Sequence, residues 1–334
     1  MNRKPKILVV GSFVMDLIAT TDRAPKSGQT IVGQDFHIAP GGKGANQAVQ
    51  CARLGADVTM IGCVGGDIFA RELLDTARDA GVHVEHVKID PSVSSGIGHV
   101  LLEVTEHSAQ NRITVIPGAN QHLYPEDIAW LQPRIQEYDM VLLQMEIPLE
   151  INLLVSQWAA DAGIPVMLNP APAAALSDQL LSHVTYLTPN EQEAAVETGL
   201  PLHTTDGSIS EETDLQAIAA ALREKGVEHV IITLGGNGSA VVEQTGIHYI
   251  PIVKMPHVAD PTAAGDSFVA ALCIGLCAGM TQEQALFFAS YTAAITVSRM
   301  GAMPSLPTLE EVLQLIRQRG ETSIPVQLLD ILKR

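Results

Sequence analysis

Basic residues are scarce in this chain of 334 residues, where 20 lysines and arginines stand against 37 aspartates and glutamates. The resulting net charge of −17 argues against nucleic acid or an anionic membrane as a partner, because both are bound through an excess of Lys and Arg. Any phosphate group would have to be held locally, by backbone N–H groups, a metal ion or a few lysines.

Cysteines are also few, and their positions do not indicate a disulfide framework. The four of them lie in apolar stretches without Cys-x-x-Cys spacing, at Cys51, Cys63, Cys273 and Cys277. This usage predicts reduced core residues of a cytoplasmic protein and argues against a zinc site.

No apolar run is long enough to span a bilayer; one of the longest covers residues 268–280. The first residues resemble a signal peptide, with basic side chains before Ile-Leu-Val-Val, but Gly11-Ser12 and Asp16 interrupt the apolar run. We therefore expect a buried strand over residues 6–11.

Short apolar runs alternate with segments of helical periodicity along most of the chain. Strands are expected at residues 6–11, 58–62, 141–145, 166–169 and 230–234, and helices at 44–54, 67–79, 149–162, 215–225, 267–280 and 283–297. This alternation predicts an α/β fold with a mostly parallel central sheet and helices on both faces. Strand-like runs at 30–38, 96–104 and 112–116 predict a small antiparallel lid, inserted at about 13–40 and 96–117 into one domain over 1–334.

The segment Asp260-Pro-Thr-Ala-Ala-Gly-Asp266 is the most informative stretch, because small residues lead directly into an apolar helix. Ala264 and Gly265 leave room for an anion to approach the unpaired N–H groups at the helix start. A carboxylate beside an anion needs a chemical purpose, which makes Asp266 a candidate general base. The alternative is that Asp266 is an ordinary N-cap.

A second glycine-rich joint, Gly41-Gly-Lys-Gly-Ala-Asn46, opens another expected helix. Its glycines would let a ligand lie against the main chain, with Lys43 and Asn46 beside it. On the alternative interpretation it is a loop-to-helix joint with an exposed lysine. Asp16 and Glu146 follow expected strands, where ligand-binding residues of open α/β sheets lie, although Asp16 could be a solvent-facing turn residue.

Two further motifs each have two interpretations. Asn190 and Glu193 form the pattern of a capping box, but they could also hold Mg²⁺ through water near a polyphosphate. The glycine-rich turn that follows the strand at 230–234 suits close contact with a nucleotide, and a simple hairpin explains it as well.

These motifs, in this order, resemble the ribokinase-like family of sugar kinases (phosphofructokinase-B type) over nearly the whole chain. The resemblance implies a three-layer fold, ATP and Mg²⁺ as cofactors, activation by K⁺, and a lid that also forms a homodimer interface. It implies Asp266 as the base, with the anion hole at Ala264 and Gly265. The implied sugar-binding residues are Asp16, Gly42, Lys43, Asn46 and Glu146. For the nucleotide, the resemblance implies Mg²⁺ and phosphate near Asn190 and Glu193, and an ATP site lined by Thr233, Gly235 and Gly238. It implies a K⁺ site near Asp260, Thr262, Thr296, Arg299, Gly301 and Ser305.

Val14 departs from the family pattern. Ribokinases usually have an asparagine two residues before the residue that matches Asp16, where it binds ribose hydroxyls, whereas the deoxyribose kinases of the family resemble this chain in having an apolar residue. An apolar side chain there cannot hydrogen-bond a 2-hydroxyl. The hypothesis is a pentose kinase that prefers or accepts 2-deoxy-D-ribose.

Other functions remain open from the residues. A kinase of a nucleoside or a phosphorylated hexose needs an aromatic cleft or extra basic residues, of which the expected lid strands have few. A sugar-binding regulator without catalysis is a second class. A dinucleotide-binding dehydrogenase is a third, although residues 11–16 lack the Gly-x-Gly-x-x-Gly turn.

Overall fold

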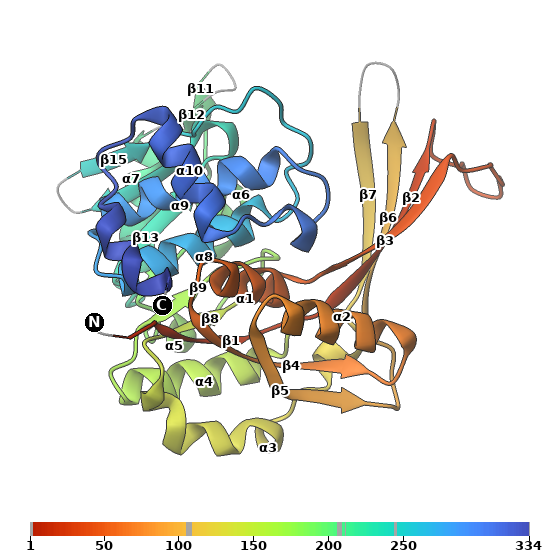
Figure 1. Cartoon of the computed structure of the whole chain (residues 1–334), viewed down its shortest axis with the longest axis horizontal. Coiled ribbons are helices and arrows are strands. Elements are labelled where there is room, and N and C mark those ends of the chain that lie inside the picture. Colours follow the sequence, from red (N-terminus) through yellow and green to blue (C-terminus); the bar gives the residue numbers. More distant parts are fainter. Residues whose placement is uncertain (1–2, 105–108, 206–208, 211, 244–245, 334) are drawn as a thin grey trace.

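A nine-stranded sheet forms the centre of the molecule, with the strand order β15-β14-β13-β10-β9-β8-β1-β4-β5 (Figure 1). The computed structural model describes residues 3–104, 109–205, 209–210, 212–243 and 246–333. The strands of this sheet are β1 (Lys6–Val10), β4 (Asp57–Gly65), β5 (Val82–Asp90), β8 (Met140–Leu143), β9 (Val166–Leu168), β10 (Tyr186–Leu187), β13 (His229–Thr233), β14 (Ser239–Glu243) and β15 (Gly246–Ile250). The strands from β13 to β5 pair in parallel, and β14 and β15 form an antiparallel hairpin ladder at one edge.

Helices cover both faces of this sheet and enclose two separate apolar cores. One core contains side chains of α1 (Lys43–Arg53), α2 (Ile68–Asp79), α8 (Ala264–Cys277), α9 (Gln282–Val297) and α10 (Leu309–Arg319). The other contains side chains of α3 (Pro125–Ile128), α4 (Leu149–Asp161), α5 (Asp178–Leu181), α6 (Glu191–Thr198) and α7 (Glu212–Glu224). Alternate residues of β1 point to opposite cores, Ile7 to the first and Leu8 to the second. The predicted three-layer α/β fold is confirmed.

A four-stranded lid sheet projects from this body (Figure 1). Its strands are β2 (Val14–Thr21), β3 (Asp35–Gly41), β6 (Gly96–Val104) and β7 (Ala109–Ile116), in the order β3-β2-β6-β7. β2 and β6 pair in parallel and the other neighbours pair in antiparallel fashion. Residues 105–108, between β6 and β7 in the chain, lie outside the described residues.

The predicted limits of the strand at residues 30–38 are wrong at the start, since β3 begins at Asp35 and continues to Gly41. Pairing explains the shift: β2 ends at Thr21, and its ladder with β3 ends where Thr20 meets Asp35. Only Thr21 of β2 remains beyond that pair, so the residues before Asp35 lie outside the ladder.

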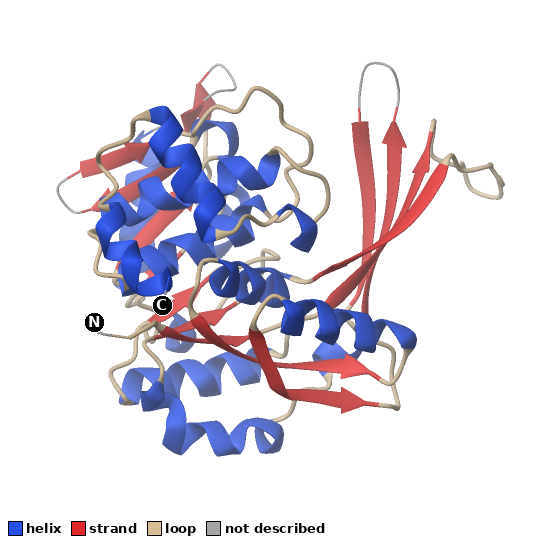
Figure 2. Cartoon of the chain, viewed as in Figure 1, coloured by secondary structure: helices blue, strands red, loops and turns tan. Residues whose placement is uncertain are grey.

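The remaining elements are short (Figure 2). β11 (Thr204–Thr205) and β12 (Ile209–Ser210) form a two-stranded ladder, and 3-10 helices lie at Gly118–Gln121, Ala129–Glu137, Gly235–Asn237, Met303–Ser305 and Val326–Lys333. All four cysteines are free and buried, as predicted. In the described part of the chain, no helix has both the length and the apolar character needed to cross a membrane.

Candidate active site

Polar residues gather at the carboxyl ends of the central parallel strands, among them Glu146 and Asn190, which the sequence had indicated. Ser12 follows β1, Glu146 follows β8, Asn169 follows β9 and Asn190 follows β10. Because neighbouring parallel strands end at the same edge of a sheet, these side chains share one end of the molecule. α1 and α8 both begin there, so their N-terminal N–H groups face the same region.

The start of α8 is shaped for an anion. Ala263, the N-cap residue, has a φ of 60° and is the only non-glycine residue with a positive φ among the described residues. Such conformations cost free energy and are concentrated at functional sites. The Ala264 N–H donates to the carbonyl of Pro261 at 3.2 Å, whereas the Gly265 N–H has no acceptor within the described protein. The space that a Cβ of Gly265 would occupy is open, so a ligand can reach this N–H.

Asp266 lies in the first turn of α8 and is only 8% exposed. Its Oδ2 accepts a hydrogen bond from Asn46 Nδ2 at 2.8 Å, and its Oδ1 accepts one from Gln47 Nε2 at 3.1 Å. The N-cap interpretation is wrong, because Ala263 holds the N-cap position and the carboxylate points toward α1 instead of its own helix start. Burial raises the pKa of Asp266; the charge of Lys43 and both amide donors oppose that rise, and Glu146 adds to it.

Gly42 and Glu146 set the start of α1. Gly42, its N-cap, has a φ of 96°, and a Cβ there would lie 2.8 Å from the Val14 backbone nitrogen, so only glycine fits. Glu146 Oε2 accepts from the Lys43 N–H at 2.9 Å and from the Ser12 hydroxyl. Burial lowers the pKa of the half-buried Lys43 ammonium, but Asp266, Glu146 and Glu193 raise it, and the net direction is upward.

The lid contributes Asp16 and Val14, which are two residues apart on β2 and share one face of the strand. A Cβ at Gly98 of the neighbouring strand would lie 2.1 Å from Asp16 Oδ1 and 3.6 Å from a methyl group of Val14. The Asp16 carboxylate has no hydrogen-bond donor within the described protein. Its pKa is raised to about 6 by burial first and then by Glu146 and Asp260.

Asn46 offers a second free acceptor. While its Nδ2 is bonded to Asp266, its Oδ1 is buried without a donor in the described protein. A buried amide oxygen without a partner is costly, and a hydroxyl group of a ligand would satisfy it. Asn46 and Asp266 thus form one polar wall of the site, and Asp16 on the lid supplies another acceptor.

Asn190 and Glu193 form the predicted capping box of α6. Glu193 accepts from the backbone N–H of Asn190 at 2.8 Å and from its side chain at 2.9 Å, and Asn190 Oδ1 accepts from the Glu193 N–H at 2.8 Å. Both carboxylate oxygens are therefore engaged, which fits contact with Mg²⁺ through water better than direct ligation. Burial raises the pKa of Glu193, and Asp266 adds to that effect.

Thr233 lies beside Asn190 through a parallel β-bridge. The turn after it holds Gly235 and Gly238, with φ of 52° and 93°. A Cβ at Gly238 would lie 2.1 Å from the carbonyl oxygen of Ile250, while the space at Gly235 is open. The hairpin interpretation is confirmed, because β13 and β14 pair in antiparallel fashion, and its turn directly follows the carboxyl end of β13.

The positions expected around a monovalent cation lie near the start of α8 and the end of α9. Asp260 connects two of them, because its Oδ1 accepts from the Thr262 N–H at 2.9 Å and its Oδ2 accepts from the Gly301 N–H at 3.0 Å. Thr296 donates to Ser267 at 2.8 Å. The side chains of Arg299 and Ser305 are bonded elsewhere, to Glu311 and to the Ala302 carbonyl, so only their backbone carbonyls are free for an ion.

Two buried glutamines of this site were not expected from the sequence. Gln47 contacts Asp266 directly, and Gln144 donates to Gln47 Oε1 at 2.6 Å. Gln47 could have been identified from its spacing, because it lies one helical turn after Lys43 and therefore on the same face of α1.

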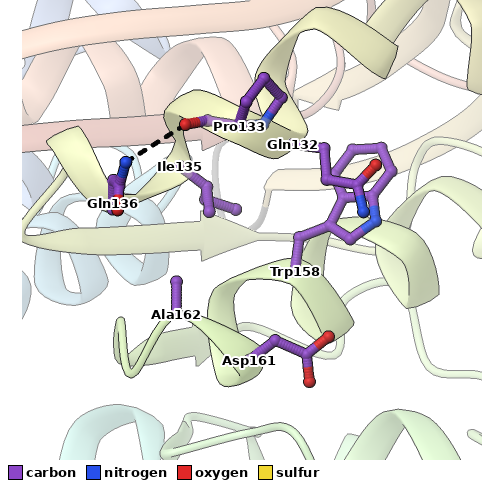
Figure 3. A pocket seen from close by; sticks show the side chains of 7 residues that line it. All are labelled: Gln132, Pro133, Ile135, Gln136, Trp158, Asp161 and Ala162. Atoms are coloured by element: carbon purple, nitrogen blue, oxygen red, sulfur yellow. Dashed lines mark hydrogen bonds between the residues drawn. The ribbon is translucent and has the colours of Figure 1, made fainter.

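A surface pocket of about 340 Å³ lies elsewhere, between the 3-10 helix Ala129–Glu137 and α4 (Figure 3). It is lined by Trp158, Asp161 and residues of that 3-10 helix and includes none of the predicted site residues. Within the described residues, no cluster of three or more His, Cys, Asp or Glu side chains could hold a metal ion.

Comparisons with known proteins agree with this geometry. Residues 4–309 match the pfkB family of carbohydrate kinases. The ribokinase of Bacillus subtilis (strain 168) is 37% identical over 313 residues, which cover 93% of this chain and 99% of the relative. The deoxyribokinase of Salmonella typhimurium (strain LT2) is 33% identical over 306 residues, covering 91% of this chain and 96% of the relative.

Among solved structures, Arabidopsis thaliana ribokinase complexed with ribose and ATP is similar with a TM-score of 0.84 at 31% identity, covering 94% of this chain and 99% of its own. The dehydrogenase interpretation is therefore excluded. Because the family match covers nearly the whole chain and the relatives align over almost their full length, the chain belongs to the pfkB family of carbohydrate kinases and is a sugar kinase of the ribokinase family.

Proposed function

We propose that this chain is a pentose kinase, one domain over residues 1–334, that transfers the γ-phosphoryl group of MgATP to the 5-hydroxyl of 2-deoxy-D-ribose or D-ribose. The observation that carries the proposal is the position of Asp266. It is a buried carboxylate at the start of a helix whose Gly265 N–H is free, and it faces Lys43 and Asn46. A proton acceptor beside an anion site is the arrangement that phosphoryl transfer to a hydroxyl requires.

In this mechanism the sugar lies between the lid and α1. Asp16 and Asn46 Oδ1 accept hydrogen bonds from its hydroxyl groups, and Glu146 holds the start of α1 in place. Asp266 takes the proton of the attacking hydroxyl as that oxygen approaches the γ-phosphorus. The Gly265 N–H, with Ala264 and the Lys43 ammonium, stabilises the charge on the transferred group. Closure of the lid excludes water, which would otherwise compete as the acceptor.

The nucleotide lies along the carboxyl ends of β10 and β13 in this proposal, against Thr233, Gly235 and Gly238. Asn190 and Glu193 would hold Mg²⁺ through water, and the ion would neutralise charge on the phosphates. K⁺ would be held beside the start of α8, mostly by backbone carbonyls, near Asp260, Thr262, Thr296, Arg299, Gly301 and Ser305. The bonds from Asp260 to Thr262 and Gly301 support this placement because they join the two loops that would surround the ion.

The choice between the two pentoses depends on Val14 in this proposal. ADP release with MgATP and K⁺ is expected to give a kcat/KM for 2-deoxy-D-ribose at least equal to that for D-ribose. Val14→Asn adds an amide beside Asp16 and should raise the ribose to deoxyribose ratio by about tenfold, the value of one hydrogen bond of about 1.4 kcal/mol. Val14→Ala, which removes the side chain without adding a donor, is the matched control.

A wild-type preference for ribose of about tenfold or more would contradict the role of Val14 but leave the kinase proposal intact. No turnover with either sugar, while a nucleoside is phosphorylated, would contradict the pentose assignment itself.

We also propose a homodimer formed through the lid sheet. Large apolar side chains are exposed on both faces of the lid sheet: Ile113 and Val115, at 55% and 53%, share one face, and Phe36, at 61%, lies on the other. Exposed apolar side chains on a projecting sheet favour burial against another surface. A second copy of this chain is the partner proposed.

Ile113→Glu should convert a dimer into monomers in light scattering coupled to size-exclusion chromatography. Ile89→Glu is the control, because Ile89 is 57% exposed but lies on β5 outside the lid. A monomeric wild-type protein, or an Ile113→Glu variant that stays dimeric, would contradict the lid interface.

A further inference from the structure

A line of buried amides lies behind the carboxylate of Asp266. Gln144 Nε2 donates to Gln47 Oε1 at 2.6 Å, and Gln47 Nε2 donates to Asp266 Oδ1 at 3.1 Å. Gln47 Nε2 also lies 3.5 Å from Asn169 Oδ1. Both glutamines are completely buried. The mechanism above does not use either of them.

The chemistry of the groups determines the direction of these bonds. An ionised carboxylate can only accept hydrogen bonds, so Gln47 must turn its NH₂ group toward Asp266. Its oxygen then points away from Asp266 and needs a donor, which Gln144 supplies. Gly11 makes room for this arrangement, because a Cβ at that position would lie 2.2 Å from Gln144 Oε1.

We propose that Gln47, oriented by Gln144, is a positioning residue that holds the carboxylate of Asp266 against α1 in the geometry needed for proton abstraction. This inference rests on the proposed function of Asp266. Asn46 bonds the other oxygen, so the two amides together fix the rotation of the carboxylate. Asn46 also faces the ligand, whereas Gln47 contacts only protein groups.

Gln47 also affects the pKa of Asp266. Burial raises the pKa of Asp266, and the Gln47 hydrogen bond is one of the interactions that lower it again. The charged groups around Asp266 are Lys43 on α1, Glu146 after β8 and Glu193 on α6. If Gln47 is removed, only Lys43 and Asn46 still lower the pKa of Asp266 against the effects of burial and the two glutamates. The base would then be protonated over a wider range of acid pH.

The test replaces Gln47 with methionine, which keeps the length of the side chain and removes the donor. Losing a hydrogen bond to a charged group corresponds to about a tenfold to hundredfold change, and we expect kcat to fall by that amount. The acid limb of the kcat profile should move up by about one pH unit. Saturating sugar is used because Asp16, which faces the sugar, would influence kcat/KM.

Gln50→Met is the matched control. Gln50 is also completely buried on α1, but its Nε2 donates to the Pro307 carbonyl at 2.9 Å and it does not touch Asp266. We expect this variant to lose stability without a shift of the acid limb. Gln144→Leu should reduce kcat in the same direction as Gln47→Met but by less, and the double variant should be no worse than Gln47→Met alone, because both act on one bond.

Sugar binding measured by calorimetry without ATP separates positioning from binding. We expect the Kd of Gln47→Met to stay within about threefold of wild type, so that the loss appears in kcat. If wild type releases ADP with a pentose but Gln47→Met keeps its kcat and its acid limb, the positioning role is overturned. If wild type has no sugar-dependent ADP release, the proposed function fails instead.

Discussion

Asp266→Asn is expected to lower kcat by about 10²-fold or more while the protein remains folded, because general base catalysis contributes about 10²- to 10⁴-fold. Asparagine has nearly the same shape but cannot accept the proton of the attacking hydroxyl. The KM for ATP should change little, since the carboxylate is bonded to α1 and not to the turn after β13. The measurement is steady-state ADP release at saturating pentose and MgATP.

The stability of this variant gives a second readout. An acid whose pKa is raised by burial is destabilising in its ionised form at neutral pH; this cost shrinks as the pH falls below the raised pKa and is gone below the pKa of the unfolded chain. Removing the charge should therefore leave the Tm unchanged or higher at pH 7, and the difference from wild type should shrink in acid. Such a pattern, with activity lost and stability kept, is typical of functional residues.

Glu197→Gln is the control for removing a buried carboxylate. Glu197 is 5% exposed, accepts from the Leu176 N–H and pairs with Lys225 at 3.3 Å, and it is not part of the site. This variant should retain kcat. Near-full activity of Asp266→Asn would remove the base assignment, whatever the control shows.

Gly98→Ala is expected to raise the KM for the sugar by about tenfold or more, because each hydrogen bond to a charged group contributes about 1.5–3 kcal/mol. The new methyl carbon would lie 2.1 Å from Asp16 Oδ1, so the carboxylate must rotate away from its position. The backbone of Gly98 does not have a positive φ, so no backbone strain is expected. The KM for ATP should not change, since the nucleotide is proposed to lie against β10 and β13 and not against the lid strands.

Gly33→Ala provides the comparison within the lid region. A Cβ at Gly33 would meet only the Thr20 carbonyl oxygen at 3.4 Å, which is an ordinary contact. Initial rates over a range of sugar concentrations measure both variants. A sugar KM for Gly98→Ala within about twofold of the Gly33→Ala value would show that the Asp16 carboxylate does not hold the sugar.

Several features of the molecule were predictable because they depend on short stretches of sequence. The continuous apolar runs of β1 and β8 indicated strands buried on both faces, and the spacing of Asn190 and Glu193 indicated a capping box. The pairing of the lid strands was harder to predict. The start of β3 was placed too early, because strand limits depend on the partner strand, and that partner ends at Thr21.

The role of Asp266 could not be decided locally, because the same position in sequence suits an N-cap or a base. The structure excludes the N-cap, since the left-handed Ala263 begins the helix and the Asp266 side chain reaches α1. Both Asn46 and Gln47 come from more than 200 residues away, with separations of 220 and 219. A pattern that extends over only one helix cannot reveal contacts between residues so far apart in the chain.

By itself the sequence determined the fold class, the family and the residue types at the strand ends, because periodicity, glycine-dependent turns and helix starts are local properties. Only the tertiary structure decided which side chains meet. The bond from Gln144 through Gln47 to Asp266 joins the end of β8, the face of α1 and the start of α8. Side-chain direction within a packed core depends on how those three elements dock, and docking is a long-range property of the whole chain.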